Sequence, residues 1–406
     1  MSKPMCTGTR IAACVLVVGF FLIGCAATPG RERAWGYVVS TAYSPDGATI
    51  AAVTSESEVA LFDTVPLRFR QSLTGEADKV PITRGVADQI GAAFRILPLR
   101  FSCDGTLLAS SSASGQVTVW VASTGEARWR LPVGGMVSDL AWSPDGRTLL
   151  TTGPSATLWS MDNGARLADL LLPPAATATS AGLSPDGRQM VVGLSTGEIA
   201  VFDLASRATL QTLRAHTAPV SGLAFRPDGV VLASTAGGYD LRLWKSNPDK
   251  TFEASDAAAS AASAQAEVDR AQGAGLLLWL FGTVRGFQIA GAPTLGAPPI
   301  VAGAQSQLAR AARATPFHCG SRVAFSADGR TLASSANLLA CADCIGTLAP
   351  GFLLFVTDLQ AGTSTTVRDL GCDVALSPDG RTFTTAGPGA PQLRSSATGR
   401  QLPSAP

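Results

Sequence analysis

Residues 139–146 read DLAWSPDG, and this stretch decides the fold. Large and small apolar residues alternate over Leu140, Ala141 and Trp142, which is the two-residue period of a β-strand. The Asp-Gly pair that follows is typical of a tight turn into a second, antiparallel strand. The stretch therefore predicts a strand and the turn that reverses the chain.

Six further stretches repeat this pattern: STAYSPDG, PLRFSCDG, SAGLSPDG, GLAFRPDG, RVAFSADG and DVALSPDG. The seven turns occupy residues 44–47, 102–105, 143–146, 184–187, 226–229, 326–329 and 377–380. An aromatic residue recurs 18 positions after the first turn residue, at Phe62, Trp120, Phe202 and Trp244. The regular spacings between turns are 41, 41 and 42 residues. Such a period predicts one four-stranded propeller blade per repeat.

These features resemble the WD40 family, although the Trp-Asp pair of that family is absent. The resemblance implies an all-β, seven-bladed propeller over residues 36–406, which acts as one cooperative domain and as a scaffold for protein interaction. The Gly-His signature of the family survives only as His216. We expect His216 to be structural and to hydrogen-bond toward Ser234 and Trp244 in its own blade.

Arg100 interrupts a column of small residues in the expected first strands. The same position holds Ala141, Gly182, Ala224, Ala324 and Ala375 in other blades. We expect the guanidinium of Arg100 to pair with a nearby acid. The alternative is that it points into the central channel.

Three intervals between turns, of 58, 100 and 51 residues, exceed one blade. The excess falls in segments 75–93, 252–317 and 337–351. The longest separates blades five and six, and its Ala-rich start predicts a helix. Its apolar run GLLLWLFGTV, residues 275–284, can pack onto the scaffold, form an exposed patch for a partner or membrane, or build a degenerate eighth blade.

All three segments are expected on one face of the propeller. Connections from a fourth strand to the next first strand, and from a second to a third strand, emerge on the face opposite the Asp-Gly turns. Long loops on a rigid scaffold often carry function, so we expect a protein partner to bind this face. The alternative is that insertions accumulate wherever they do no harm.

The first 24 residues predict an export signal, with two positive charges, no acid and an apolar run shorter than the ~20 residues of a membrane-spanning helix. Leu22-Ile23-Gly24-Cys25 resembles the lipobox of bacterial lipoproteins. The resemblance implies that residues 1–24 are removed, that Cys25 is lipidated and that residues 25–35 form a tether. The protein would then face the periplasm or exterior from the cell envelope, on the outer membrane if the cell has one. The alternatives are a plain secretory signal or an N-terminal anchor helix.

Four cysteines are expected to lie together: Cys319, Cys341, Cys344 and Cys372. Outside the cytoplasm they favour two disulfides, with one loop cysteine joined to Cys319 and the other to Cys372. A Cys341–Cys344 bridge is a second pattern, and a zinc site near His318 or a redox pair are further alternatives. Cys103 replaces the proline of one turn and is expected to be a lone thiol on the opposite face.

Charge and residue content weigh against nucleic acid and catalysis. The chain has 31 basic and 30 acidic residues, so its charge of +1, or −1 without Lys3 and Arg10, does not favour nucleic acid. Only two histidines, His216 and His318, are available for a metal site or a Ser-His-Asp arrangement. We predict a membrane-tethered, non-catalytic scaffold without a metal or cofactor. The rival hypotheses are an extracytoplasmic, lactonase-like propeller hydrolase and an envelope-assembly lipoprotein.

Overall fold

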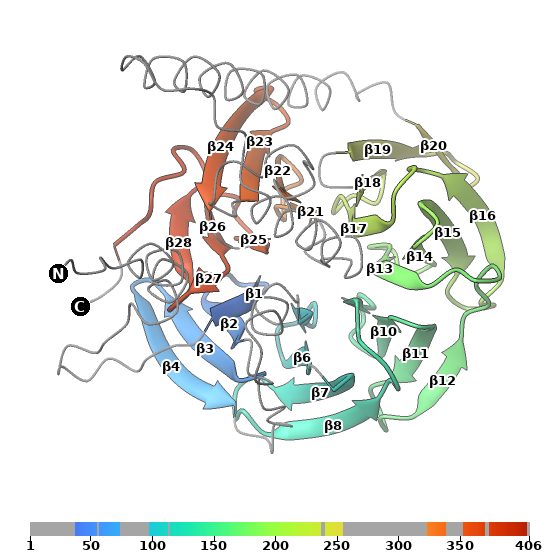
Figure 1. Ribbon diagram of the computed structural model, residues 1–406, viewed down its shortest axis with the longest axis horizontal. Helices are drawn as coiled ribbons and strands as arrows, with labels where there is room; N and C mark the ends of the chain where they lie inside the picture. Colours follow the sequence, from blue (N-terminus) through green and yellow to red (C-terminus); the bar gives the residue numbers. More distant parts are fainter. Residues whose placement is uncertain are drawn as a thin grey trace, which may run out of the picture.

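The computed structural model describes residues 37–54, 57–73, 97–112, 114–236, 240–254, 323–337, 352–369 and 373–403. These residues form seven antiparallel sheets arranged in a ring around one axis (Figure 1). The prediction of an all-β, seven-bladed propeller is confirmed. Most of the segment predicted to be partly helical, including the run 275–284 proposed as an eighth blade, lies outside the described residues. The described part of the chain contains no helix that is long and apolar enough to cross a membrane.

Blade one consists of β1 (Tyr37–Tyr43), β2 (Thr49–Thr54), β3 (Val59–Thr64) and β4 (Leu67–Leu73). Blade two consists of β5 (Leu99–Phe101), β6 (Leu107–Ser111), β7 (Gln116–Val121) and β8 (Ala127–Pro132). Blade three consists of β9 (Asp139–Trp142), β10 (Thr148–Thr152), β11 (Ala156–Ser160) and β12 (Arg166–Asp169). Blade four consists of β13 (Ala178–Leu183), β14 (Gln189–Leu194), β15 (Glu198–Asp203) and β16 (Thr209–Arg214).

Blade five consists of β17 (Val220–Phe225), β18 (Val231–Ala236), β19 (Asp240–Ser246) and β20 (Phe252–Ala254). The outer strand β20 therefore takes the first three residues of the segment predicted as the insertion 252–317. Blade six consists of β21 (Val323–Phe325), β22 (Thr331–Asn337), β23 (Phe352–Asp358) and β24 (Thr363–Asp369). Blade seven consists of β25 (Val374–Leu376), β26 (Thr382–Thr385) and β28 (Gln392–Ser395), while β27 (Gly387–Pro388) joins the sheet of blade one.

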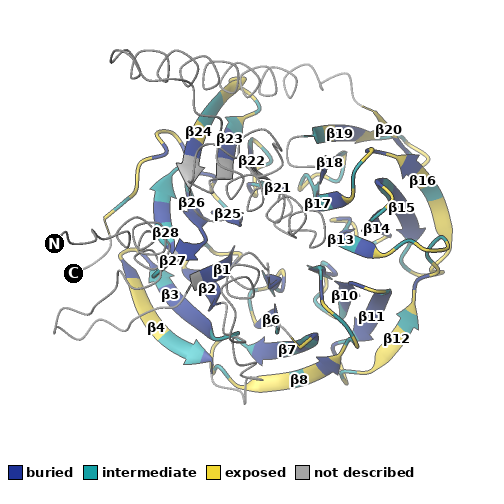
Figure 2. Cartoon of the chain, in the orientation of Figure 1, coloured by how far each residue is buried: buried dark blue, intermediate teal, exposed yellow. Residues whose placement is uncertain are grey.

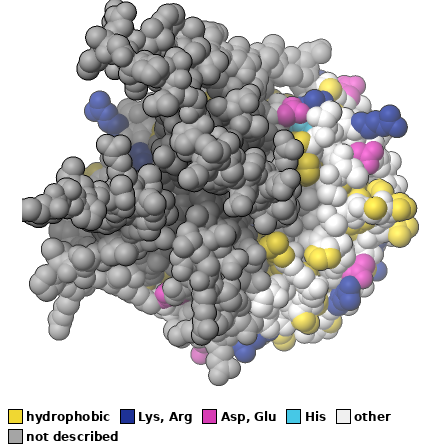
Figure 3. All heavy atoms as spheres, in the orientation of Figure 1, with side chains coloured by type: hydrophobic (Ala, Val, Ile, Leu, Met, Phe, Trp, Pro, Cys, Tyr) yellow, Lys and Arg dark blue, Asp and Glu magenta, His cyan; other side chains and the backbone are white. Residues whose placement is uncertain are grey.

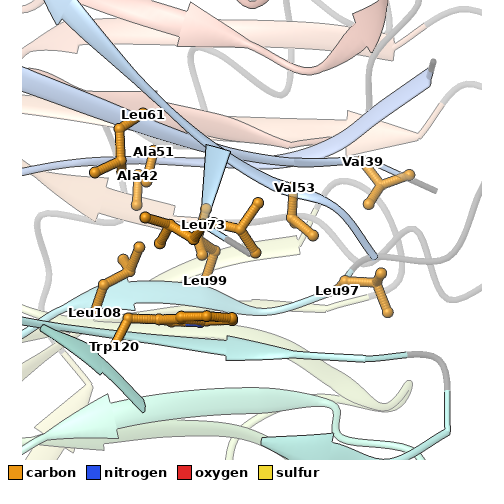
Figure 4. Packing of buried hydrophobic residues seen from close by; sticks show 11 residues of the cluster. Val39, Ala42, Ala51, Val53, Leu61, Leu73, Leu97, Leu99, Leu108 and Trp120 are labelled. Atoms are coloured by element: carbon orange, nitrogen blue, oxygen red, sulfur yellow. The ribbon is translucent and has the colours of Figure 1, made fainter. Parts of the chain in front are cut away.

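The hydrophobic core lies between neighbouring blades. The cluster in Figure 4 joins Val53 and Leu61 of blade one to Leu99, Leu108 and Trp120 of blade two. Inner and middle strands are buried on both sides because each blade is covered by the next, whereas outer strands such as β8, β12 and β16 expose one side (Figure 2). A single blade cannot bury its own faces, so the ring folds as one unit.

In the described part of the chain, blades seven and one join without an exchanged outer strand. Residues 37 and 38 of β1 pair with β27. The Ser40 hydroxyl and the Thr41 backbone N–H both donate to the Asp373 carboxylate, at 2.5 and 3.1 Å. On the outer side of blade seven, Leu402 N–H donates to the Leu393 carbonyl at 2.8 Å. The last described residues thus stand in place of a fourth strand.

The Asp-Gly turns form a second ring on one side of the disc. In blade three, Ser143 Oγ donates to Asp145 at 2.6 Å and accepts from Thr148 N–H at 2.8 Å. The Ser143 hydroxyl and the Arg147 backbone N–H hold the pKa of Asp145 below its usual value. The turn is therefore closed by its own side chains.

Each turn also contacts the turn of the neighbouring blade. Gly105 has φ +72°, and a Cβ atom there would lie 3.2 Å from Pro45 Cδ of the preceding turn. The same relation links the turns of blades one, four and five to prolines of their preceding turns. Gly146 has no such neighbour within 4 Å, because Cys103 stands where the proline would be.

Candidate interaction face

The disc has two faces of different construction. Successive first strands run in the same direction, so the Asp-Gly turns and the turns between third and fourth strands lie on one face, here called the turn face. The other connections lie on the connection face. The intervals β4–β5, β20–β21 and β22–β23 all leave and return on the connection face. The strand ends therefore agree with the predicted placement of segments 75–93, 252–317 and 337–351, whose own residues lie almost wholly outside the described part.

His216 lies in a hydrogen-bonded row at the connection face of blade five. Its Nε2 lies 2.8 Å from Ser234 Oγ, which also accepts from Trp244 Nε1 at 2.9 Å. Its Nδ1 lies 2.7 Å from Asp240 Oδ2. The structure thus brings together His216, Ser234 and Trp244, as expected, and adds Asp240. Asp240 was not predicted, although the sequence carries a signal for it: it is the first residue of the third strand, 14 positions after the first turn residue, where blades one and four hold Glu58 and Glu198.

The protonation of this row follows from its burial. Desolvation lowers the pKa of His216 below its ordinary value, against the opposing pull of the Asp240 carboxylate. Partial burial opposes ionisation of Asp240, yet hydrogen bonds from Arg242 and His216 hold its pKa below the usual range. At neutral pH the row therefore contains a neutral imidazole beside an ionised carboxylate.

The order Asp240, His216, Ser234 has the connectivity of a hydrolase triad, but its geometry is structural. Ser234 is fully buried, and its Oγ accepts the indole N–H of Trp244. A nucleophilic hydroxyl must reach a substrate carbon, and this one is enclosed by its own blade. Blades two and three keep the Trp–hydroxyl half of the row, since Trp120 donates to Ser110 and Trp159 to Thr151. The row orients the third strand against the second.

Two buried carboxylates link first strands near the axis. Asp139 accepts from its neighbour Leu140 N–H at 2.9 Å and from Ala181 N–H of blade four at 3.3 Å. Arg100 of blade two lies 3.5 Å from the same carboxylate. Arg100 therefore does pair with an acid, and that acid belongs to the next blade. Asp373 of blade seven likewise accepts hydrogen bonds from the first strand of blade one, at Ser40 and Thr41.

The predicted lipid and disulfide residues, Cys25, Cys319, Cys341, Cys344 and Cys372, lie outside the described residues. Cys103 is a free thiol on the turn face, with Sγ 3.8 Å from the Ser143 carbonyl oxygen. Burial raises the pKa of the Cys103 thiol, and the carboxylates of Asp104 and Asp145 raise it further. The described residues contain no group of three or more His, Cys, Asp or Glu side chains that could hold a metal ion.

Apolar side chains also reach solvent on the connection face. Leu171 is 88% exposed in the connection between blades three and four, and Met136 is 40% exposed in the connection between blades two and three. Figure 3 shows hydrophobic side chains gathered on the side of the ring that holds β15 and β16. The run Leu170-Leu171-Leu172-Pro173-Pro174 is the signal in the sequence that could have pointed to this surface.

The profile of the family described as WD domain, G-beta repeat, matches residues 99–121, 132–169 and 207–245. The chain carries WD40 repeats. The first two matches cover β5–β7 and blade three, and the last runs from the outer strand of blade four through the third strand of blade five. The WD40 prediction is therefore confirmed at the level of the repeat.

Over the aligned half of the chain, curated relatives are about a quarter identical to this protein. Angio-associated migratory cell protein from Homo sapiens is 26% identical over 219 residues, which cover 50% of each chain. "Cell division cycle 20.1, cofactor of APC complex" from Arabidopsis thaliana is 26% identical over 258 residues, which cover 52% of this chain and 54% of that protein. The chain thus spans about half the length of these relatives.

A solved propeller shares the fold across nearly the whole chain. The β-propeller domain of Cps50 (Swd1) from Myceliophteria thermophila superposes with a TM-score of 0.58 at 12% identity. The match covers 91% of this chain and 99% of that one. At this identity the likeness concerns the fold.

Proposed function

We propose that the protein is a membrane-tethered, non-catalytic WD40 scaffold outside the cytoplasm, and that it binds a protein partner through its connection face. The observation that carries the proposal is the asymmetry of the disc. Every long interruption of the repeat begins and ends on one face, while the turn face keeps the repeated Asp-Gly turns. Variable loops on a rigid scaffold are the usual place of binding function.

The comparisons support an interaction role. WD40 repeats are present in three segments, and one relative is described as a cofactor of a complex. Among the described residues, the Asp240, His216 and Ser234 row has its serine fully buried, so a substrate could not reach the hydroxyl. The tether is proposed on the lipobox Leu22-Ile23-Gly24-Cys25, in which Cys25 would carry the lipid.

A deletion of residues 255–317 tests the binding face while leaving β20 intact. Affinity capture from envelope extracts should lose the partner when this segment is removed. A matched control changes the opposite face: Arg147→Glu with Arg188→Glu alters two exposed residues beside the turns and should retain the partner. Thermal unfolding of each variant verifies the fold. Retention of the same partners by the deletion variant would contradict the proposed face.

The tether has a separate test. Cys25→Ser should release the protein from the membrane fraction, and the mass of the N-terminal peptide from the unaltered chain should show acylated Cys25. An unacylated Cys25, or unchanged membrane association of the variant, would contradict lipid anchoring and leave the scaffold role to be judged by the capture experiment.

A further inference from the structure

Exposed apolar residues on the connection face converge around blade three. They form what we call the blade-three patch: Met136, Pro154, Leu171, Pro174 and Ala175. A Cβ atom at Gly135 would lie 2.6 Å from Pro154 Cγ, and one at Gly153 would lie 2.5 Å from the Met136 carbonyl oxygen. The backbone N–H of Ala178 donates to the Gly153 carbonyl at 3.0 Å. The loops before and after blade three therefore meet on the same short turn.

The loop that presents Leu171 is fixed at both ends. Leu170 N–H donates to the Ala156 carbonyl at 2.8 Å, and Thr177 and Ser195 exchange two hydrogen bonds of 3.0 Å. Leu172 and Ala176 pack against the core between blades three and four. Their inward packing leaves Leu171 directed to solvent. An apolar side chain held outward on a fixed loop suits contact with an apolar surface, because little entropy is lost when it binds.

The position of Tyr37, the first described residue, indicates which face of the disc would lie close to a membrane anchor at Cys25. β1 is a first strand, so Tyr37 enters the disc on the connection face, the face that carries the blade-three patch. Eleven residues, 26–36, separate it from Cys25. A chain of that length reaches at most about 40 Å. A lipid on Cys25 would keep the connection face close to the bilayer and the turn face away from it.

We propose that the blade-three patch contacts the lipid bilayer to which the protein is tethered. This inference rests on the proposed lipid anchor. A few apolar side chains bind a membrane weakly by themselves, but a short tether makes their contact intramolecular and raises the effective concentration of the bilayer. The patch therefore orients the disc, while the lipid holds it. The protein partner is proposed to bind where segments 75–93, 252–317 and 337–351 leave the disc, and none of these borders blade three.

The experiment uses the full lipidated chain in vesicles of phosphatidylethanolamine and phosphatidylglycerol. The photoreactive residue p-benzoylphenylalanine replaces Leu171 in one sample and Leu167 in the other. Leu167 is the matched control because it is 44% exposed on the outer strand β12 of the same blade. After irradiation, mass spectrometry should find about ten times more phospholipid adduct at position 171 than at 167, as expected when a tether concentrates one site at the bilayer.

The N-terminal peptide of the same samples separates two kinds of failure. Acylated Cys25 with equal lipid adducts at both positions would overturn the blade-three contact alone. Crosslinks from position 171 to a second copy of the chain, in place of lipid, would overturn it in favour of self-association. An unacylated Cys25 would overturn the tether, and with it the contact that depends on the tether.

Discussion

On the turn face, six of the seven Asp-Gly turns begin with a serine whose hydroxyl donates to the turn aspartate, and neighbouring turns touch through glycine and proline. On the connection face, stabilising contacts occur once or twice: the His216 row in blade five, and Asp139 and Asp373 between first strands. The turn face thus repeats the same hydrogen-bonded turn in almost every blade. The connection face instead has contacts that occur in only one or two blades, together with the long segments that interrupt the repeat. Because neighbouring turns contact one another, an insertion would disturb the turn face. The connections on the other face lack such repeated contacts, so they can vary in length and sequence.

The largest loss is expected where a single contact joins several blades. Asp139→Ala removes the acceptor of Ala181 N–H and the partner of Arg100, and should lower the free energy of unfolding by about 3 kcal/mol. Urea unfolding measures the change. Asp162→Ala removes an exposed carboxylate from a turn of the same blade and is the control, with little expected change. Equal stability of the two variants would show that the inter-blade carboxylate is dispensable.

Ser234→Ala should have the next largest effect. It removes the acceptor of the Trp244 indole N–H and the neighbour of His216 Nε2, at a cost of about 2 kcal/mol because both groups are buried. Ser110→Ala in blade two removes only the acceptor of Trp120 and should cost about 1 kcal/mol. Denaturant midpoints of the two variants compare the rows directly. A smaller loss at Ser234 would contradict the added role of His216.

The contribution of contacts between neighbouring turns to stability can be measured by replacing two glycines with alanine. Gly105→Ala and Gly146→Ala both place a side chain at positive φ, at +72° and +68°, which costs about 1–2 kcal/mol. Only at Gly105 does the new Cβ also approach a proline, Pro45 Cδ, at 3.2 Å. Thermal unfolding should therefore show the greater loss for Gly105→Ala. Identical losses would mean that neighbouring turns do not constrain each other.

The smallest effect concerns acid sensitivity at the connection face. Burial holds the pKa of native His216 below its unfolded value of about 6.5, so below that pH the unfolded chain binds more protons than the folded one. Stability from the neutral imidazole is complete above about pH 6.5 and is lost as the pH falls through the lower native pKa. His216→Gln should unfold more easily at pH 7.5 but lose less stability between pH 7.5 and pH 5. An unchanged pH dependence in the variant would contradict the neutral, buried imidazole.

The repeat made the blades predictable because each unit carries its own strand alternation and turn. The third-strand residues Trp120, Phe202 and Trp244 all lie where the 18-residue spacing places them. The contact of His216 with Ser234 was predictable from the family because both residues lie in one blade, whereas the contact with Asp240 was not predicted. The identity of the acid that pairs with Arg100 was harder to predict. It belongs to the next blade, and the register between neighbouring blades is set by packing and not by any one repeat. Leu171 shows the same limit, because in a run of three leucines only the folded loop decides which one faces solvent.

Lysine-directed crosslinking of the protein to its neighbours in intact cells tests the central claim most directly. Lys79 belongs to segment 75–93, which leaves from the connection face, whereas Lys250 lies at the turn face, 3.4 Å from the turn residue Asp186. The half-exposed Lys250 is open to the reagent. The account predicts crosslinks between a partner protein and Lys79 and none from Lys250. Partner crosslinks confined to Lys250 would place the interaction on the turn face and contradict the account.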